Sequence, residues 1–470
     1  MKLIQTPGSP SIHRDHYASI GEHDRSTAKR KDWPINALTD IVAWLFAVAP
    51  TDTPAVDRRA RLVFLDTLGC MIAGLSKSEP KALVESLAWL EPGPVLLPGA
   101  DAPLSITSAA YLAGIAACWD EACEGLPRAH GRPGLHAFAA ALALGLGTGK
   151  THGRTLSALV AGFEVGGRLG EVMRIPPGMH VDGTWGTFAA VAAAAHLAGL
   201  DGPTTVAAIE GAACHMPWSL YLPIAEGATV RNAYVGEAAA RGIRQAVAAQ
   251  AGITAPATAL ETVGRLALGR DITAQALAPP GEWLIEQGYL KPFAAVRHIH
   301  YGAAAAIEWR RRHDDIVPSD IQALRLAIYG EAITYCGNRA PATAIQAQFS
   351  LSYGLAWALA HGDLGPDAYH AHSLQDPTVR RLEAMVTVEE EAAFTSVNKR
   401  AANLTVETAT TKETIAVDAV AGDPDLPMTR DDIIAKFLRF AAPTIGTGRA
   451  ESLAEAVLEK DHEAPLSSLM

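Results

Sequence analysis

The chain has 470 residues, of which 49% are hydrophobic and 19% charged, so it can bury large cores and wholesale disorder is excluded. The formal net charge of −11 excludes a chain-wide basic surface for nucleic acid, and five cysteines without a Cys-x-x-Cys pair exclude a disulfide framework and a zinc ribbon. The sequence shows neither a secretory signal nor an uninterrupted apolar run of about 18 residues, so we expect a cytoplasmic protein that has no membrane partner.

The chain up to residue 287 is typical of a helical protein that follows a short tail. Residues 1–32 are polar and predict a flexible segment. From Trp33 onward, apolar residues recur at three- and four-residue spacing, and alanine dominates the later segments, which predicts helices that pack closely through small side chains. We expect helices over 35–49, 53–74, 79–91, 135–147, 155–173 and 184–200.

The pattern changes near Gly288. Residues 321–329 are typical of a strand, and residues 402–420 alternate on both sides of a polar turn, which predicts a hairpin. Thr429 is a good N-cap for a helix with two aspartates in its first turn. Helical patterns lie between, over 301–313 and 346–360. We therefore expect a mostly helical protein with an all-α domain over 33–287, completed by 429–470, and a smaller α+β domain over 288–428.

Eight motifs occur in an order that is similar to that of one enzyme family. They are LDTLGCMIAG (65–74), GIAACWDEACEGLPRAHGRPGLHAFAAALALG (114–145), GFEVGGRLGE (162–171), GMHVDGTWGTFAAVAAAAHLAGLD (178–201), GATVRNAYVGEAAARG (227–242), YLKPFAAVRHIH (289–300), QFSLSYGLA (348–356) and GDPDLPMTRDDIIAKF (422–437). Over about residues 36–455 the chain resembles the MmgE/PrpD family, which includes 2-methylcitrate dehydratase, cis-aconitate decarboxylase and iminodisuccinate epimerase. The resemblance implies a large all-α domain, a smaller α/β lid domain, a homodimer, and an active site between the domains that uses no organic cofactor.

The reactions of this family pass through proton transfer next to a carboxylate. The resemblance therefore implies a cofactor-independent lyase of the dehydratase or decarboxylase type, 2-methylcitrate dehydratase-like, that acts on a small anionic di- or tricarboxylate. Two alternatives stay open, an epimerase or racemase of an iminodisuccinate-like dicarboxylate and a non-catalytic binding paralogue. Solvent deuterium exchange without loss of water or carbon dioxide would indicate epimerisation, and no exchange would favour binding alone.

A polycarboxylate substrate needs cations for its carboxylates and groups that move a proton. The motifs supply Lys291 and Arg231, which stands at the position of a family lysine. Arg297, His298 and His300 follow, and in a strand the two histidines would face one side and Arg297 the other. The His-x-His pair could ligate a metal instead. Neither a carboxylate nor a third histidine lies at motif distance, so we expect anion binding or proton transfer, without a metal.

Three further motifs supply acid–base candidates. His180 precedes a helix in a Gly-rich turn, where backbone N–H groups of the helix N-terminus could hold a substrate carboxylate. Glu121 and Glu124 share one face of a helix if that helix continues to Gly125, and the negative end of the helix would then raise their pKa. Tyr335 matches a lid-domain tyrosine of the family.

The block around Glu121 departs from the family pattern. The best-characterised members carry Asp-x-Asp-Asp-Thr followed by His-Pro, whereas here Arg132 stands before a proline in place of that histidine. His130 or His136 could supply the missing imidazole, and spacing alone does not decide between them. We expect catalytic roles for His180, Glu121, Lys291 and Tyr335, and substrate binding by Arg132, Arg231, Arg297, His298 and His300.

Overall fold

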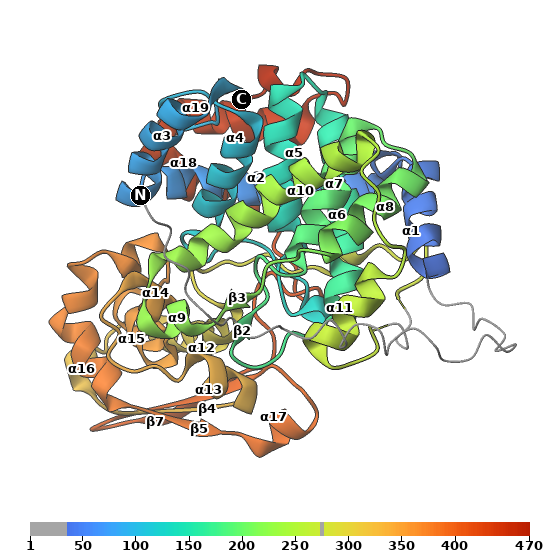
Figure 1. Cartoon of the computed structure of the whole chain (residues 1–470). Helices are drawn as coiled ribbons and strands as arrows, with labels where there is room; N and C mark the ends of the chain where they lie inside the picture. The colour runs from blue at the N-terminus through green and yellow to red at the C-terminus, as the bar shows by residue number, and fades with distance from the viewer. Residues whose placement is uncertain (1–34, 273–276) are drawn as a thin grey trace, which may run out of the picture.

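The computed structural model describes residues 35–272 and 277–470, which form a mostly helical protein with one small mixed sheet (Figure 1). The tail predicted over 1–32 lies outside the described residues. No helix in these two ranges is both long enough and apolar enough to cross a membrane. The first helices are α1 (Ile35–Ala47), α2 (Pro54–Leu75), α3 (Ser78–Leu90), α4 (Ile106–Cys118), α5 (Pro133–Gly147), α6 (His152–Val172), α7 (Gly186–Ala198), α8 (Gly202–Ala213), α9 (Leu222–Glu226), α10 (Ala233–Gln250) and α11 (Ala259–Leu268).

The Ala-rich helices pack closely, as the sequence predicts. Helix α7 lies against α5, α6 and α10 and is buried from Gly186 to Leu197. A Cβ atom added to Gly166 of α6 would lie 2.5 Å from the Cβ of Ala189 in α7, and one added to Gly162 would lie 2.6 Å from the Cβ of Ala137 in α5. The glycines of this stretch therefore allow neighbouring helix backbones to approach each other, which confirms the interpretation of small residues as a packing device.

The second part of the chain contains the sheet. Its strands run in the order β5-β4-β6-β7, with β5 parallel to β4 and the other pairs antiparallel. The predicted strand over 321–329 and the predicted hairpin over 402–420 are both confirmed. Helix α12 packs against β6 and β7 on one side and against α15 on the other. The elements of this part are α12 (Arg297–Arg312), β4 (Ile321–Ile328), α13 (Gly330–Cys336), α14 (Ala344–Gln348), α15 (Leu351–His361), α16 (Pro377–Met385), β5 (Val386–Glu390), α17 (Ala392–Ser396), β6 (Ala402–Thr408) and β7 (Lys412–Val417).

The end of the chain returns to the first helices. Thr429 caps α18 (Arg430–Ile445) in a capping box with Asp432, as predicted. Helices α18 and α19 (Thr447–Glu459) pack against α2, and Figure 1 shows them in red beside the blue N-terminal helices. A buried ion pair of 2.6 Å joins Lys436 of α18 to Asp66 of α2. The mostly helical fold with a small α+β part is thus as expected, while the domain boundaries stay a prediction.

Candidate active site

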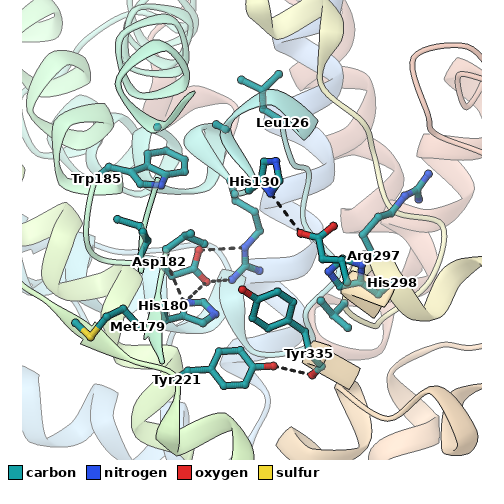
Figure 2. A pocket seen from close by; sticks show the side chains of 18 of the residues that line it. Leu126, His130, Met179, His180, Asp182, Trp185, Tyr221, Arg297, His298 and Tyr335 are labelled. Atoms are coloured by element: carbon teal, nitrogen blue, oxygen red, sulfur yellow. Dashed lines mark hydrogen bonds and ion pairs between the residues drawn. The ribbon is translucent and has the colours of Figure 1, made fainter. Parts of the chain in front are cut away.

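A cavity of about 440 Å³ is lined by side chains from both parts of the chain. The helical part contributes the loop after α4, the short strand β2 (Met179–His180), which pairs with β3 (Ser219–Leu220), and the segment before α10. The sheet-bearing part contributes residues at the start of α12, from α13 and from the loop before β6. Figure 2 shows how side chains from these elements converge, with His180 and Asp182 facing Tyr335 and Tyr221. The cavity therefore lies where residues of both parts of the chain meet.

Glu121 lies at the centre of a buried ionic cluster beside this cavity. Its carboxylate lies 2.7 Å from Lys291 Nζ and 3.1 Å from Arg132 Nη1, and it accepts a hydrogen bond from Arg231. The Arg132 Nη1 contact has no hydrogen-bond geometry, so this nitrogen keeps a free donor. Lys291 Nζ also donates to the Glu121 carbonyl at 2.8 Å. Three predicted site residues, Arg132, Arg231 and Lys291, thus meet at the carboxylate of a fourth, Glu121.

Asp182 is a second carboxylate in the cluster. It accepts a hydrogen bond from Arg132, and Arg231 Nη2 lies 3.7 Å from its Oδ2. The side chains of Asp182, Glu121, Arg132, Arg231 and Lys291 are each at most 5% exposed. Three cations and two carboxylates leave one positive charge, which is the balance that a buried site for an anionic ligand requires.

The loop that carries Glu121 differs from the prediction. Helix α4 ends at Cys118, so Glu121 and Glu124 do not share a helical face, and that prediction is wrong. Glu121 has φ of +51°, in the left-handed region that disfavours residues with a side chain. Burial by itself raises the pKa of Glu121, but Arg132, Arg231 and Lys291 outweigh it and hold the pKa well below its usual range. The expectation of a raised pKa at Glu121 is therefore also wrong, because the cations come from distant parts of the chain.

Glu124 behaves in the opposite way. Its side chain is buried, its Oε1 accepts a hydrogen bond of 2.8 Å from the Leu135 N–H at the start of α5, and its Oε2 has no partner among the described residues. Burial outweighs this hydrogen bond and the nearby Arg132, and raises the pKa of Glu124 to about 8. Glu124 is therefore protonated at neutral pH, and its raised pKa agrees with the expectation for this residue. Its hydrogen bond to Leu135 supports the start of α5.

Replacement of Glu124 by glutamine is expected to stabilise the protein at alkaline pH. The pKa of Glu124 in the folded state lies above its unfolded value of about 4.3, so Glu124 stabilises the folded state fully at pH values below the unfolded pKa. This stabilisation is lost as the pH rises toward 8. Glutamine has no such titration and can still accept the Leu135 hydrogen bond. In urea unfolding, the free energy of unfolding of Glu124→Gln relative to wild type should increase by about 3–5 kcal/mol between pH 5 and pH 8. An equal difference between variant and wild type at both pH values would contradict the assignment.

His180 is placed at the cavity by the short strand β2, and only 9% of it is exposed. The backbone N–H of Asp182 donates to His180 Nδ1 at 3.0 Å, so in the neutral ring the proton resides on Nε2. Burial, followed in effect by the charges of Arg231 and Arg132, lowers the pKa of His180 to about 4, against the opposing effect of Asp182. At neutral pH, His180 is therefore a neutral imidazole with an Nε2–H that can donate to a ligand.

His136 holds the turn that carries His180. Its Nδ1 lies 2.8 Å from the Arg132 carbonyl, and its Nε2 accepts a hydrogen bond of 3.1 Å from the Gly183 N–H. A Cβ atom at Gly186 would lie 2.3 Å from His136 Nε2, so only glycine fits there. The Gly183 N–H belongs to the Gly-rich turn that was expected to hold a substrate carboxylate, but it is used within the protein. Both ring nitrogens of His136 are occupied, and the ring is fully buried.

Arg297, His298 and His300 lie in the first turn of α12, so the arrangement considered for a strand does not occur. Arg297 lines the cavity, but its guanidinium donates to Asp423 and lies over the ring of Tyr289. His298 lines the cavity, whereas His300 is fully buried and lies 3.0 Å from the Ala295 carbonyl. The helical turn therefore separates the two histidines that a strand would have placed on one face.

Tyr335 of α13 lines the cavity from the sheet-bearing part. Its ring stacks on His298, with ring centroids 6.1 Å apart and an interplanar angle of 13°. Its backbone carbonyl accepts a hydrogen bond of 2.7 Å from the Tyr221 hydroxyl. Tyr221 follows β3, so this bond joins the two walls of the cavity (Figure 2). The placement agrees with the expected position of Tyr335 at the site, while its catalytic role stays a prediction.

Sequence reasoning missed several lining residues. Asp182 lies only two residues after His180 in the same Gly-rich turn, and a search for carboxylates near each candidate histidine could have found it. Tyr221, Glu331 and Arg400 lie in segments without a distinctive local pattern, so only the tertiary structure brings them to the cavity. In the described ranges, 35–272 and 277–470, no three His, Cys, Asp or Glu side chains are grouped so that they could hold a metal ion.

Comparisons with known proteins agree on one family. The model of the MmgE/PrpD N-terminal domain matches residues 39–267, and that of the MmgE/PrpD C-terminal domain matches residues 293–461. A curated relative, the cis-aconitate decarboxylase-like protein oryM of Aspergillus oryzae, is 26% identical over 471 aligned residues. This alignment covers 93% of the chain and 96% of the relative.

Proposed function

The chain belongs to the MmgE/PrpD family, a family of the dehydratase and decarboxylase type, and on this premise we propose that it is a lyase that needs no organic cofactor. Its substrate is a small di- or tricarboxylate, and the reaction proceeds by proton transfer at a carbon next to a carboxylate. The observation that carries the proposal is the buried cluster around Glu121, with its one excess positive charge, beside the neutral Nε2–H of His180.

The cluster supports carboxylate binding because its three cations, Arg132, Arg231 and Lys291, line the cavity. A substrate carboxylate in the cavity lies next to their excess positive charge and can bring the local charge to zero. The carboxylates of Glu121 and Asp182 keep the guanidinium groups oriented before the substrate arrives, so little side-chain entropy is lost on binding.

His180 supports the chemical step. Removal of a proton next to a carboxylate moves negative charge onto the carboxylate oxygens, and a donor aimed at those oxygens stabilises that charge in the transition state. A neutral imidazole is suited to this role because it does not give up its own proton easily, and burial at the cavity strengthens the interaction.

Incubation with candidate substrates in deuterated water tests the proposal. We expect 2-methylcitrate, cis-aconitate or a related di- or tricarboxylate to incorporate deuterium and to lose water or carbon dioxide, as measured by mass spectrometry. Exchange without such loss would assign an epimerase instead. A panel in which no carboxylate exchanges or reacts, while some still bind in calorimetry, would overturn the lyase and favour a binding protein.

The cationic donors give a separate prediction. Arg231→Ala should lower kcat/KM by about 10- to 150-fold, since loss of one charge-assisted hydrogen bond costs about 1.5–3 kcal/mol. Arg231→Lys should keep partial activity, because an ammonium group retains the charge but not the planar fork that contacts both Glu121 and the substrate. Steady-state kinetics should show this order, and a kcat/KM within about twofold of the wild-type value for both variants would contradict it.

A further inference from the structure

His130 lies at the cavity in an unusual backbone conformation. It follows the short turn Pro127–Ala129, and its φ of +52° places it in the left-handed region. Four described non-glycine residues have a positive φ, and three of them, Glu121, His130 and Asn398, line the cavity. Backbone strain of this kind persists where the surrounding structure enforces it and is concentrated at functional sites. The loop over 126–131 is closed by a hydrogen bond of 2.8 Å between its ends, which fixes the position of His130.

Glu331 of α13 lies opposite His130. Its Oε1 is 3.4 Å from His130 Nδ1, and Figure 2 shows this contact as a dashed line from the ring. Arg400 Nη2 lies 3.6 Å from the other oxygen of the same carboxylate. The contact with His130, together with the charge of Arg400, lowers the pKa of Glu331 to about 2 despite its partial burial, so the group is an anion at neutral pH.

The Glu331 carboxylate lies at ion-pair distance from Nδ1, without hydrogen-bond geometry, and its negative charge favours the proton on that nitrogen and leaves Nε2 as the basic atom. No group within 35–272 or 277–470 hydrogen-bonds to His130 Nε2, and the side chain, which is 38% exposed, lines the cavity. His180 has the opposite tautomer, because its Nδ1 accepts a backbone N–H. Of these two cavity histidines, His130 therefore supplies a base and His180 a donor.

The other candidates for the missing imidazole are engaged elsewhere. Arg132, which stands at the family position, carries a guanidinium paired with Glu121 and Asp182 and cannot act as a base at neutral pH. Both ring nitrogens of His136 are bonded to the backbone in a fully buried pocket. Among the three positions that the sequence left open, only His130 has a free basic nitrogen at the cavity.

We propose that His130, oriented by Glu331, is the proton-transfer residue of this protein in place of the histidine missing at position 132. His130 comes from the helical part of the chain and Glu331 from the sheet-bearing part, so the pair joins the two walls of the cavity. The inference rests on the proposed function, since it assigns a residue to that same proton transfer.

The step balances without a further reactant. The lone pair of His130 Nε2 forms an N–H bond as the C–H bond next to a substrate carboxylate breaks, and the C–H electron pair moves into the carboxylate as an enediolate. The resulting imidazolium is stabilised by the Glu331 carboxylate. It then returns its proton, either to a departing hydroxyl group, which leaves as water, or to a substrate carbon. Glu331 touches only His130 in this scheme and is a positioning residue.

Two substitutions at His130 separate catalysis from folding. Glycine and asparagine both tolerate the left-handed region, so His130→Gly and His130→Asn should keep the loop intact. Each should lower kcat by about 100-fold or more with an unchanged thermal midpoint. Free imidazole should restore activity to His130→Gly, because it can occupy the space of the lost ring. His372→Ala, at an exposed histidine that does not line the cavity, is the matched control and should keep full activity.

Glu331→Gln tests the positioning role through His130. We expect kcat to fall about tenfold or more with little change in KM, because a neutral amide no longer orients the His130 ring or stabilises the imidazolium that forms during the proton transfer. The groups that face the pair are His298, Arg400 and Tyr335, and they are unchanged in this variant. In the His130→Gly background, Glu331→Gln should have little further effect, whereas a merely structural role would produce additive losses.

The outcomes distinguish this inference from the proposed function. If the wild-type protein transforms a carboxylate and the kcat of both His130 variants stays within about twofold of the wild-type value, the proposed lyase function is retained and the role of His130 is wrong. The role of His130 would also be overturned if the His130 variants lose much of their kcat, imidazole does not restore it in His130→Gly, and these losses add to those of Glu331→Gln. If the wild-type protein transforms no carboxylate in the panel, the proposed function itself fails.

Discussion

Replacement of His180 by asparagine is expected to lower kcat by about 10²–10³-fold with little change in stability. The Oδ1 atom of asparagine can take the place of His180 Nδ1 as acceptor for the Asp182 N–H, so the turn should persist. The variant lacks only the Nε2–H that we propose to stabilise the negative charge of the transition state, and removal of one such donor typically costs this factor. Steady-state kinetics with the substrate identified in deuterated water would measure it.

His180→Gln is the matched control for that variant. Its amide nitrogen can reach the position of Nε2, so it should retain more activity than His180→Asn. The pH profile adds an independent check, because His180 with a pKa of about 4 is neutral from pH 5 upward. Activity that rises steeply as pH falls from 6 to 4, and that loses this rise in His180→Asn, would show that the imidazolium acts as an acid and would contradict the neutral donor.

Local patterns predict much of the fold. Apolar spacing locates the long helices, alternation locates the hairpin over 402–420, and Thr429 caps its helix as expected. These features depend on residues within a few positions of one another, which is why the sequence reveals them. The arrangement of His298 and His300 is not settled by the local pattern, because it depends on whether their segment is a strand or a helix. The segment is helical from Arg297 and packs against α15 and the sheet.

The candidate site is less predictable because its contacts are long-range. The motifs contain Arg132, Arg231 and Lys291, but they do not show that all three meet at Glu121, from up to 170 positions away. That convergence gives Glu121 the opposite pKa shift from the one that a helix C-terminus predicts. The contact of His130 with Glu331 joins residues about 200 positions apart and has no local signature. Motifs therefore supply candidates, and tertiary structure assigns their partners.

Replacement of Glu121 by glutamine is expected to destabilise the protein by about 3–5 kcal/mol. The substitution preserves volume but leaves Arg132, Arg231 and Lys291 buried with Asp182 as the remaining carboxylate of the cluster. Removal of one partner from a buried ionic cluster exposes the uncompensated charge to a medium that solvates it poorly, and costs of this size are typical. Urea unfolding at pH 7 would measure the loss. Glu121→Asp keeps the charge and should lose less stability.

Charge balance, and not the identity of the side chain, should govern this loss. Lys291→Met combined with Glu121→Gln removes one charge of each sign, so the double variant should recover part of the stability that Glu121→Gln loses. The pH dependence has a defined sign. The pKa of Glu121 is held below its usual range, so its contribution is present above the unfolded value of about 4.3 and is lost as pH falls through the folded value. The stability difference between wild type and Glu121→Gln should therefore shrink below about pH 4. Two results together would contradict this view: stability losses of the two single substitutions that simply add in the double variant, and a stability difference between wild type and Glu121→Gln that does not change with pH. They would mean that Glu121 acts through packing and that the cluster is not held by its charges.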